Sequence, residues 1–87
     1  MANSISEADL KTMRELGQKA LSDPEVIHGK PINEASEYIA ISTGDEWREL
    51  RGAFMEGCVA ADYYTSNRAM KALIILDMGA RRLTEER

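Results

Sequence analysis

The segment KALIILDMGARRL, residues 71–83, decides the fold class. Four large apolar residues stand together at positions 73–76, which fits either a buried strand or a helix that is apolar on more than one side. A buried parallel strand would need neighbouring strands and crossover helices, and the chain offers no second convincing strand. The main apolar positions are spaced by three, four and three residues, as in a helix: Leu73, Leu76, Ala80 and Leu83. The segment therefore predicts a helix, and this seam extends backward to Ala69.

Asp77 is the one acid inside this segment, and in a strand it would be a candidate catalytic carboxylate. In a helix it lies four residues before Arg81. Oppositely charged residues at this spacing form ion pairs on the helix surface. We therefore expect Asp77 to pair with Arg81 and to have a structural role only.

Length and composition are typical of one small folded domain. The chain has 87 residues, 44% hydrophobic and 30% charged, with a net charge of −4. No apolar run approaches the roughly 20 residues of a membrane span, and the N-terminus has no secretory pattern. The single cysteine cannot form an internal disulfide. These features predict a soluble protein of a reducing, cytoplasmic setting.

Four helices are expected along the chain. Ser6 can cap a first helix over residues 7–22. A short helix over 34–42, capped by Asn33, is favoured over a strand formed by EYIAIST. Thr43 and Glu46 form a capping-box pattern before a helix over 45–64. The segment TSN then favours a break before a helix over 68–85, with one unbroken helix as the alternative. VIHGKP (26–31) predicts a loop, with a short extended piece at 26–27.

The fold class predicted is therefore all-α, a small helical bundle. It is built on a C-terminal antiparallel helical hairpin, with the shorter N-terminal helices packed on it. One face of the third helix is expected in the core: Trp47, Leu50, Phe54, Cys58 and Ala61. We expect Trp47 and Phe54 to anchor that core, so that Trp47→Ala largely unfolds the protein.

Both long helices carry a second apolar stripe. On the third helix it comprises Met55, Val59 and Tyr63, and on the fourth Met70, Ile74 and Met78. A helix packed once against a core needs only one stripe. We therefore predict that these six residues form a contact with a protein partner or with a second copy of the chain, a dimer being favoured. The alternative is a monomeric bundle that covers both stripes internally.

Motifs for chemistry are sparse. The chain has one histidine, His28, and one cysteine, Cys58. We expect Cys58 to lie in the core. The sequence contains no P-loop and no dinucleotide-binding glycine motif. The pairs Glu34/Glu37 and Glu46/Glu49 have ExxE spacing, which can hold Mg²⁺ in all-α hydrolases. The later acids are singly spaced: Glu56, Asp62 and Asp77. No cofactor and no catalytic residue is predicted.

The segment ASEYIAISTGDEWREL, residues 35–50, resembles in its local rhythm the A-x-x-L-G-I-S start of the helix-turn-helix in small excisionase-like regulators. That resemblance implies a DNA-binding regulator. Ala40 replaces the turn glycine, and Glu46 replaces the buried aliphatic residue of the recognition helix. The acids Asp45, Glu46 and Glu49 would repel phosphates. DNA binding is therefore an alternative hypothesis.

The function predicted first is that of a small, non-catalytic, protein-binding regulatory protein. It would self-associate and act by occupying the surface of a macromolecular partner, as phage-type inhibitors do. A helix-turn-helix DNA-binding regulator is the alternative. An all-α, carboxylate, metal-dependent nucleotide hydrolase is the second alternative.

Overall fold

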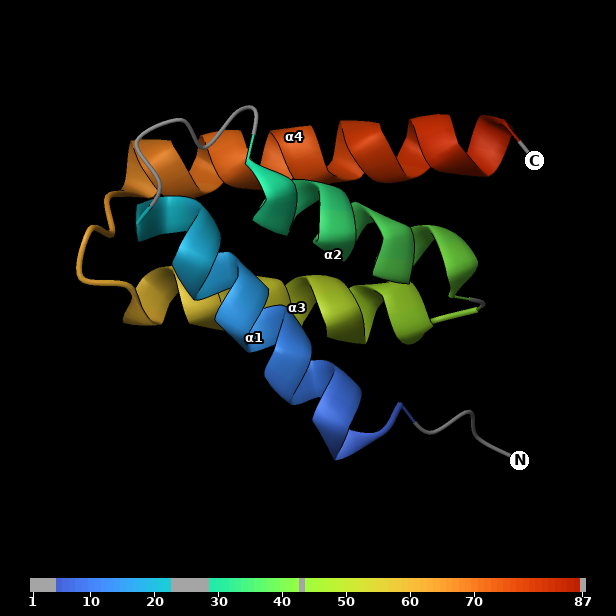
Figure 1. The fold of residues 1–87 in the computed structure, drawn as a ribbon, viewed down its shortest axis with the longest axis horizontal. Coiled ribbons are helices and arrows are strands. Elements are labelled where there is room, and N and C mark those ends of the chain that lie inside the picture. Colours follow the sequence, from blue (N-terminus) through green and yellow to red (C-terminus); the bar gives the residue numbers. More distant parts are fainter. Residues whose placement is uncertain (1–4, 23–28, 43, 87) are drawn as a thin grey trace.

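The computed structural model describes residues 5–22, 29–42 and 44–86, and within them the chain forms four helices and no strand (Figure 1). They are α1 (Glu7–Ser22), α2 (Lys30–Ile41), α3 (Glu46–Ala60) and α4 (Ser66–Glu85). The protein is an all-α small bundle, as the helical spacing of residues 71–83 predicts. The strand interpretations of residues 73–76 and of EYIAIST are wrong.

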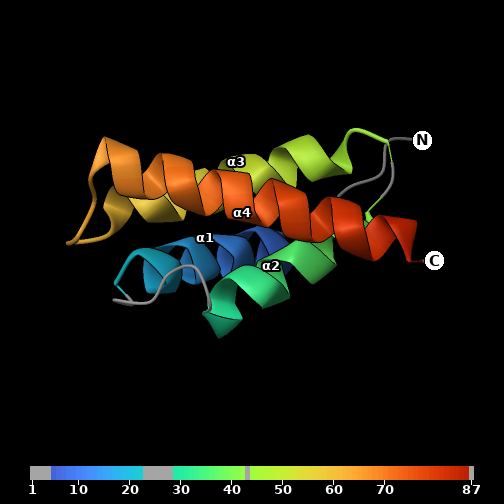
Figure 2. The same cartoon turned by 90° about the horizontal axis from the view of Figure 1, so that it is seen from above.

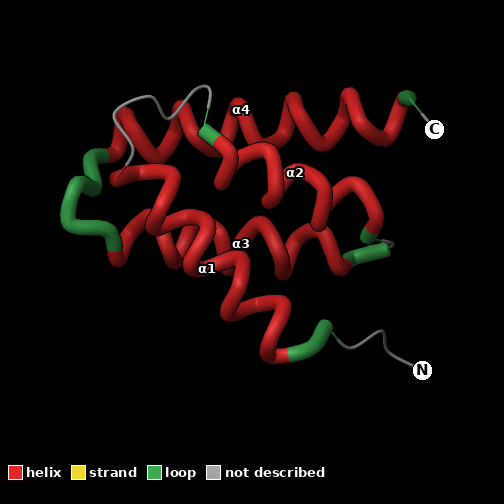
Figure 3. Tube along the Cα trace, in the orientation of Figure 1, coloured by secondary structure: helices red, strands yellow, loops and turns green. Residues whose placement is uncertain are grey.

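The helices form two layers, with α3 and α4 in one and α1 and α2 in the other (Figure 2). The most extensive packing runs across the layers, α1 on α3 and α2 on α4. Within their layer α3 and α4 contact each other much less. They run in opposite directions and are joined by a short loop (Figure 3), which is consistent with the expected hairpin.

Two helix starts follow the capping signals in the sequence. The Ser6 hydroxyl oxygen accepts a hydrogen bond from the backbone N–H of Asp9 at 3.1 Å, and α1 has the predicted bounds. The Thr65 hydroxyl oxygen accepts from the backbone N–H of Arg68 at 3.2 Å, so α4 begins at Ser66, two residues earlier than expected. The break between the long helices is confirmed, and the single unbroken helix is wrong.

Helix α2 begins four residues before its predicted start. Gly29 is its N-cap and Pro31 lies in its first turn. Proline suits this position because its fixed φ matches the helix and its missing N–H would have no partner there. Pro31 therefore opens the helix instead of belonging to a loop before it. The short extended piece expected at 26–27 lies outside the described residues.

Helix α3 also differs from its predicted bounds. It begins at Glu46, with no side-chain hydrogen bond from its N-cap Asp45, and the expected cap Thr43 lies outside the described residues. It ends at Ala60, four residues early. Ala61 turns to an extended conformation there, with φ −72° and ψ 142°, and its side chain stays buried. Tyr63 and Tyr64 therefore follow the helix.

The core receives side chains from all four helices. Its largest fully buried members are Met13, Leu21, Ile32, Phe54, Cys58 and Leu76. The predicted inner face of α3 is buried from Leu50 onward, but Trp47 is 42% exposed. Trp47 lies in the first turn of α3, before the helix reaches the core, and the guanidinium carbon of Arg48 is 5.5 Å from its ring centroid. The predicted role of Trp47 as a core anchor is wrong, whereas Phe54 has that role.

Helices α1 and α3 cross in backbone contact at two glycines. A Cβ atom added to Gly17 would overlap the carbonyl oxygen of Phe54, and one added to Gly57 would overlap the carbonyl oxygen of Arg14. Each helix thus places a glycine against the backbone of the other. A side chain at either position would force the two helices apart.

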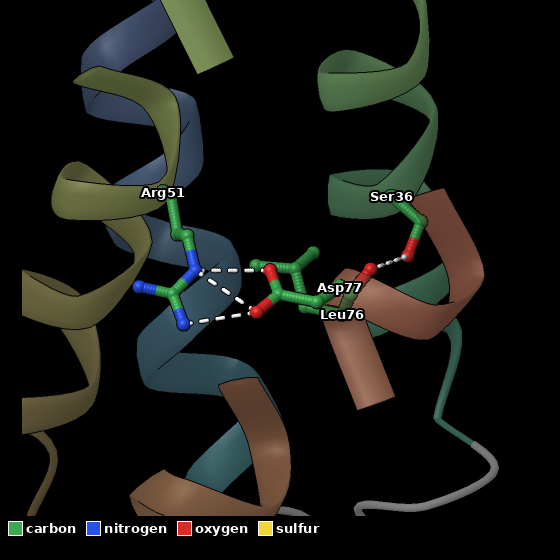
Figure 4. Close-up of polar contacts among 4 residues, drawn as sticks. All are labelled: Ser36, Arg51, Leu76 and Asp77. Carbon is green, nitrogen blue, oxygen red and sulfur yellow. Dashed lines mark hydrogen bonds and ion pairs between the residues drawn. The ribbon is translucent and has the colours of Figure 1, made fainter. Parts of the chain in front are cut away.

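A serine joins α2 to α4. The Ser36 hydroxyl donates to the carbonyl oxygens of Ile32 at 2.8 Å and of Leu76 at 3.3 Å, and the second of these bonds is drawn in Figure 4. A Cβ on Gly79 would lie 2.7 Å from the Ser36 oxygen. Small residues therefore allow close packing at this contact as well.

Gly57→Ala should strongly destabilise the protein, because the added methyl group meets the backbone of α1. Overpacking of this kind costs about 2–3 kcal/mol, which for a domain of this length lowers Tm by roughly 10–20 °C. Gly52→Ala is the matched control, since a Cβ there meets nothing within 4 Å. It should raise stability by about 0.5–1 kcal/mol through helix propensity. Equal thermal melting of the two variants would contradict the close crossing.

Candidate interaction surface

The outward side of α4 carries a row of exposed apolar residues. Met70, Ile74 and Met78 are 61%, 52% and 66% exposed. They are four residues apart, so they form one line along the helix. The side of α4 that faces the core is occupied by a different set of residues, all buried: Ala69, Ala72, Leu73, Leu76 and Ala80. The row is therefore additional to the surface that α4 needs for folding.

A second row lies on the side of α3 that borders α4. Arg51, Met55 and Val59 are also four residues apart, and Arg51 reaches Asp77 on α4. Val59 is 55% exposed, and Tyr63, just after the helix, is 63% exposed. Met55 is half-buried and packs against the core. Within α3 this row therefore supplies one exposed apolar side chain, Val59.

An ion pair joins the two helices at one end of these rows (Figure 4). The Arg51 Nε lies 2.9 Å from Asp77 Oδ1 and its Nη2 lies 2.9 Å from Asp77 Oδ2, a bidentate arrangement. The hydrogen bonds that Arg51 donates to Asp77 raise the pKa of the guanidinium, although partial burial opposes this. The expected pair of Asp77 with Arg81 is wrong. The partner lies 26 residues earlier, on a helix that tertiary packing brings alongside.

Together the rows define what we call the α3/α4 outer surface: Val59, Met70, Ile74 and Met78. Each of these side chains is between half and two-thirds exposed. Exposed apolar side chains that gather on one part of a surface often mark an interaction site. Tyr63, although exposed, lines a groove with Glu15 and Lys19 of α1. Lys71 and Arg81 lie next to the α4 row, and neither forms an ion pair within the described residues.

The paired carboxylates do not converge on a common site. Glu34 and Glu37 line a groove of about 560 Å³ together with Tyr38, Ile41 and Leu83. Glu49 lines a different groove, of about 300 Å³, between α1 and α3. Across residues 5–22, 29–42 and 44–86, no three His, Cys, Asp or Glu side chains lie together in a way that could hold a metal ion.

Cys58 is a core residue, as predicted. It is fully buried, and its Sγ lies 3.7 Å from the carbonyl oxygen of Gly17, to which it donates. Burial raises the pKa of the Cys58 thiol to about 11, because the thiolate cannot be solvated there. His28 lies outside the described residues.

The segment that resembles a helix-turn-helix spans the end of α2, the link that contains Gly44 and the start of α3. Gly44 has a φ of 58°, a left-handed conformation that favours glycine. Glu46 and Glu49 both lie in the first turn of α3. The start of the helix that would enter the major groove is therefore acidic.

Comparison of the chain with protein-family models, with curated proteins and with solved structures finds no match. None of the described helices combines the length and the apolar character that crossing a membrane requires. The surface itself is therefore the basis for assigning a function.

The exposure of Ile41 and of Trp47 is not predicted from the sequence. Ile41, at the end of α2, is 64% exposed. The spacing of Trp47 matches that of Leu50 and Phe54, which predicts a core position. Trp47 lies in the first turn of α3, where no residue is buried, and a position so close to the helix start could have indicated its exposure.

The Arg51–Asp77 pair should contribute little to stability, because both side chains are more than one-third exposed. A double-mutant cycle with Arg51→Gln and Asp77→Asn should give a coupling of about 0.5–1 kcal/mol. The coupling should fall as salt is raised, since the pair is screened. Urea unfolding of the four proteins at low and high salt measures it. A coupling of several kcal/mol, unchanged by salt, would contradict this description.

Proposed function

We propose that this protein is a small, non-catalytic, protein-binding regulatory protein. In this proposal it self-associates as a dimer through the α3/α4 outer surface and acts by covering the surface of a macromolecule. The observation that supports the proposal is the pair of apolar rows, which leave Val59, Met70, Ile74 and Met78 exposed on one layer.

The composition of the rows fits a protein contact. Three of the six residues predicted for the contact are methionines, whose flexible thioether chains adapt to irregular surfaces. A second copy of the chain is the occupant proposed for this surface. The one cysteine, Cys58, is a buried free thiol, which suits the reducing, cytoplasmic setting that we propose.

Ile74 occupies the middle of the α4 row, so a charge there should prevent dimerisation. We expect wild-type protein to be a dimer by light scattering at high micromolar concentration. Ile74→Lys should weaken dimerisation by more than about 100-fold, because an unpaired charge would be buried at the contact.

Ile41→Lys is the matched control, since Ile41 is also an exposed isoleucine but lies on α2 in the other layer. It should leave the mass unchanged, and both variants should keep their helical circular dichroism. A monomeric wild-type protein at several hundred micromolar would refute self-association. An equal loss in Ile41→Lys would place the contact elsewhere.

A further inference from the structure

A groove between α2 and the end of α4 has an acidic part and an apolar part. Its α2 side is one stripe of the helix, whose members lie three, four and seven residues after the first: Glu34, Glu37, Tyr38 and Ile41. Leu83 lines the groove from α4, and the groove measures about 560 Å³. None of these residues belongs to the α3/α4 outer surface, so the groove is a separate feature.

The apolar part of the groove is formed by Tyr38, Ile41 and Leu83. Ile41 is exposed, and Tyr38 is partly buried and packs against the core. The hydroxyl of Tyr38 makes no hydrogen bond with any residue that the structure describes. Packing of the chain therefore leaves an apolar surface here, with one free polar group beside it.

The two carboxylates of the groove have no partner in the fold. Neither Glu34 nor Glu37 forms an ion pair or a side-chain hydrogen bond within residues 5–22, 29–42 and 44–86. Both follow the first turn of α2, so neither caps the helix. Like charges at neighbouring positions on a helix repel each other. The acids therefore add nothing to the stability of α2.

The charge of the groove is uniformly negative over the described part of the chain, because no basic residue lines it. Arg82, next to Leu83 in the sequence, lines a different groove together with Asn33 and Met78. Complementary charge fixes which partners a surface accepts. Two unpaired carboxylates repel nucleic acids and anionic lipids, and they favour a cationic peptide whose apolar side chains can cover Ile41.

We propose that this groove binds a basic amphipathic helix of a partner protein, with an arginine at Glu34 and Glu37 and a large aliphatic side chain on Ile41 and Leu83. The planar guanidinium of arginine can bind carboxylates in a bidentate way and stack on the ring of Tyr38, which lysine cannot do.

The spacing of the groove sets the spacing in the partner. Glu37 and Ile41 are four residues apart, about one helical turn, so an arginine and a leucine one turn apart match them. This inference rests on the protein-binding part of the proposed function, because it names the chemistry of the partner. It does not depend on self-association.

A designed peptide tests the inference. The probe is a fluorescently labelled, alanine-rich helical peptide of about 15 residues, with arginines and leucines one turn apart on one face. Titration with the wild-type protein should give a dissociation constant below about 1 mM. A matched peptide with glutamate in place of each arginine should bind at least about tenfold more weakly. Absence of binding by the arginine peptide at this concentration would overturn the inference.

Removal of the two carboxylates tests the site. Glu34→Gln/Glu37→Gln should weaken binding of the arginine peptide at least about tenfold and should keep the helical circular dichroism. Glu15→Gln/Glu49→Gln is the matched control, since it changes the net charge equally on α1 and α3, away from this groove. It should weaken binding less than about twofold. Equal losses in both variants would show attraction by net charge alone and would refute the site.

Ile41→Lys and Ile74→Lys separate the failure of this inference from the failure of self-association. Ile41→Lys should abolish peptide binding, because it places a positive charge in the groove, and it should leave the mass unchanged. Ile74→Lys should keep peptide binding. If Ile74→Lys dissociates a wild-type dimer and no peptide binds, only the groove inference fails. If the wild-type protein is a monomer that binds the peptide with the expected variant effects, only self-association fails. Loss of peptide binding in Ile74→Lys but not in Ile41→Lys would place the peptide on the α3/α4 outer surface and overturn the inference.

Discussion

Backbone contact between α1 and α3 is the constraint on which the rest of the structure depends. Gly17 faces the carbonyl oxygen of Phe54, and Gly57 faces the carbonyl oxygen of Arg14. Two helices that approach this closely exclude water between them and bury their small residues together. The inner side of α3 is therefore filled by α1, and the side of α3 that borders α4 has few partners within the chain.

The arrangement of α4 follows from this pairing. Helix α4 packs mainly on α2, where the Ser36 hydroxyl donates a hydrogen bond to the Leu76 carbonyl oxygen. Its contact with α3 is smaller and includes the Arg51–Asp77 ion pair. Two helices held in this way leave their outer sides uncovered. The exposed apolar rows of α3 and α4 are thus a consequence of how the layers pair, and the proposed dimer would cover them.

The local parts of this fold could be predicted from the sequence, and the tertiary parts could not. The Ser6 cap and the apolar spacing gave the bounds of α1, and the surplus apolar residues of α3 and α4 indicated the two rows. The loop predicted at Pro31 is wrong, because proline is compatible both with a loop before a helix and with the first turn of a helix. Trp47 has core spacing, but it lies in the first turn of α3, where no residue is buried. The Arg51–Asp77 contact joins distant positions and depends on helix pairing, which no local pattern encodes.

The central claim is that a second copy covers the outer surface that the close α1–α3 pairing leaves free. Isotope-filtered nuclear Overhauser measurements on a mixture of labelled and unlabelled protein test it most directly, because they detect only contacts between subunits. The account predicts intersubunit contacts at the exposed side chains of the α3/α4 outer surface, including the methyl groups of Met70, Ile74 and Met78. Intersubunit contacts confined to α1 and α2, or none in a concentrated sample, would contradict it.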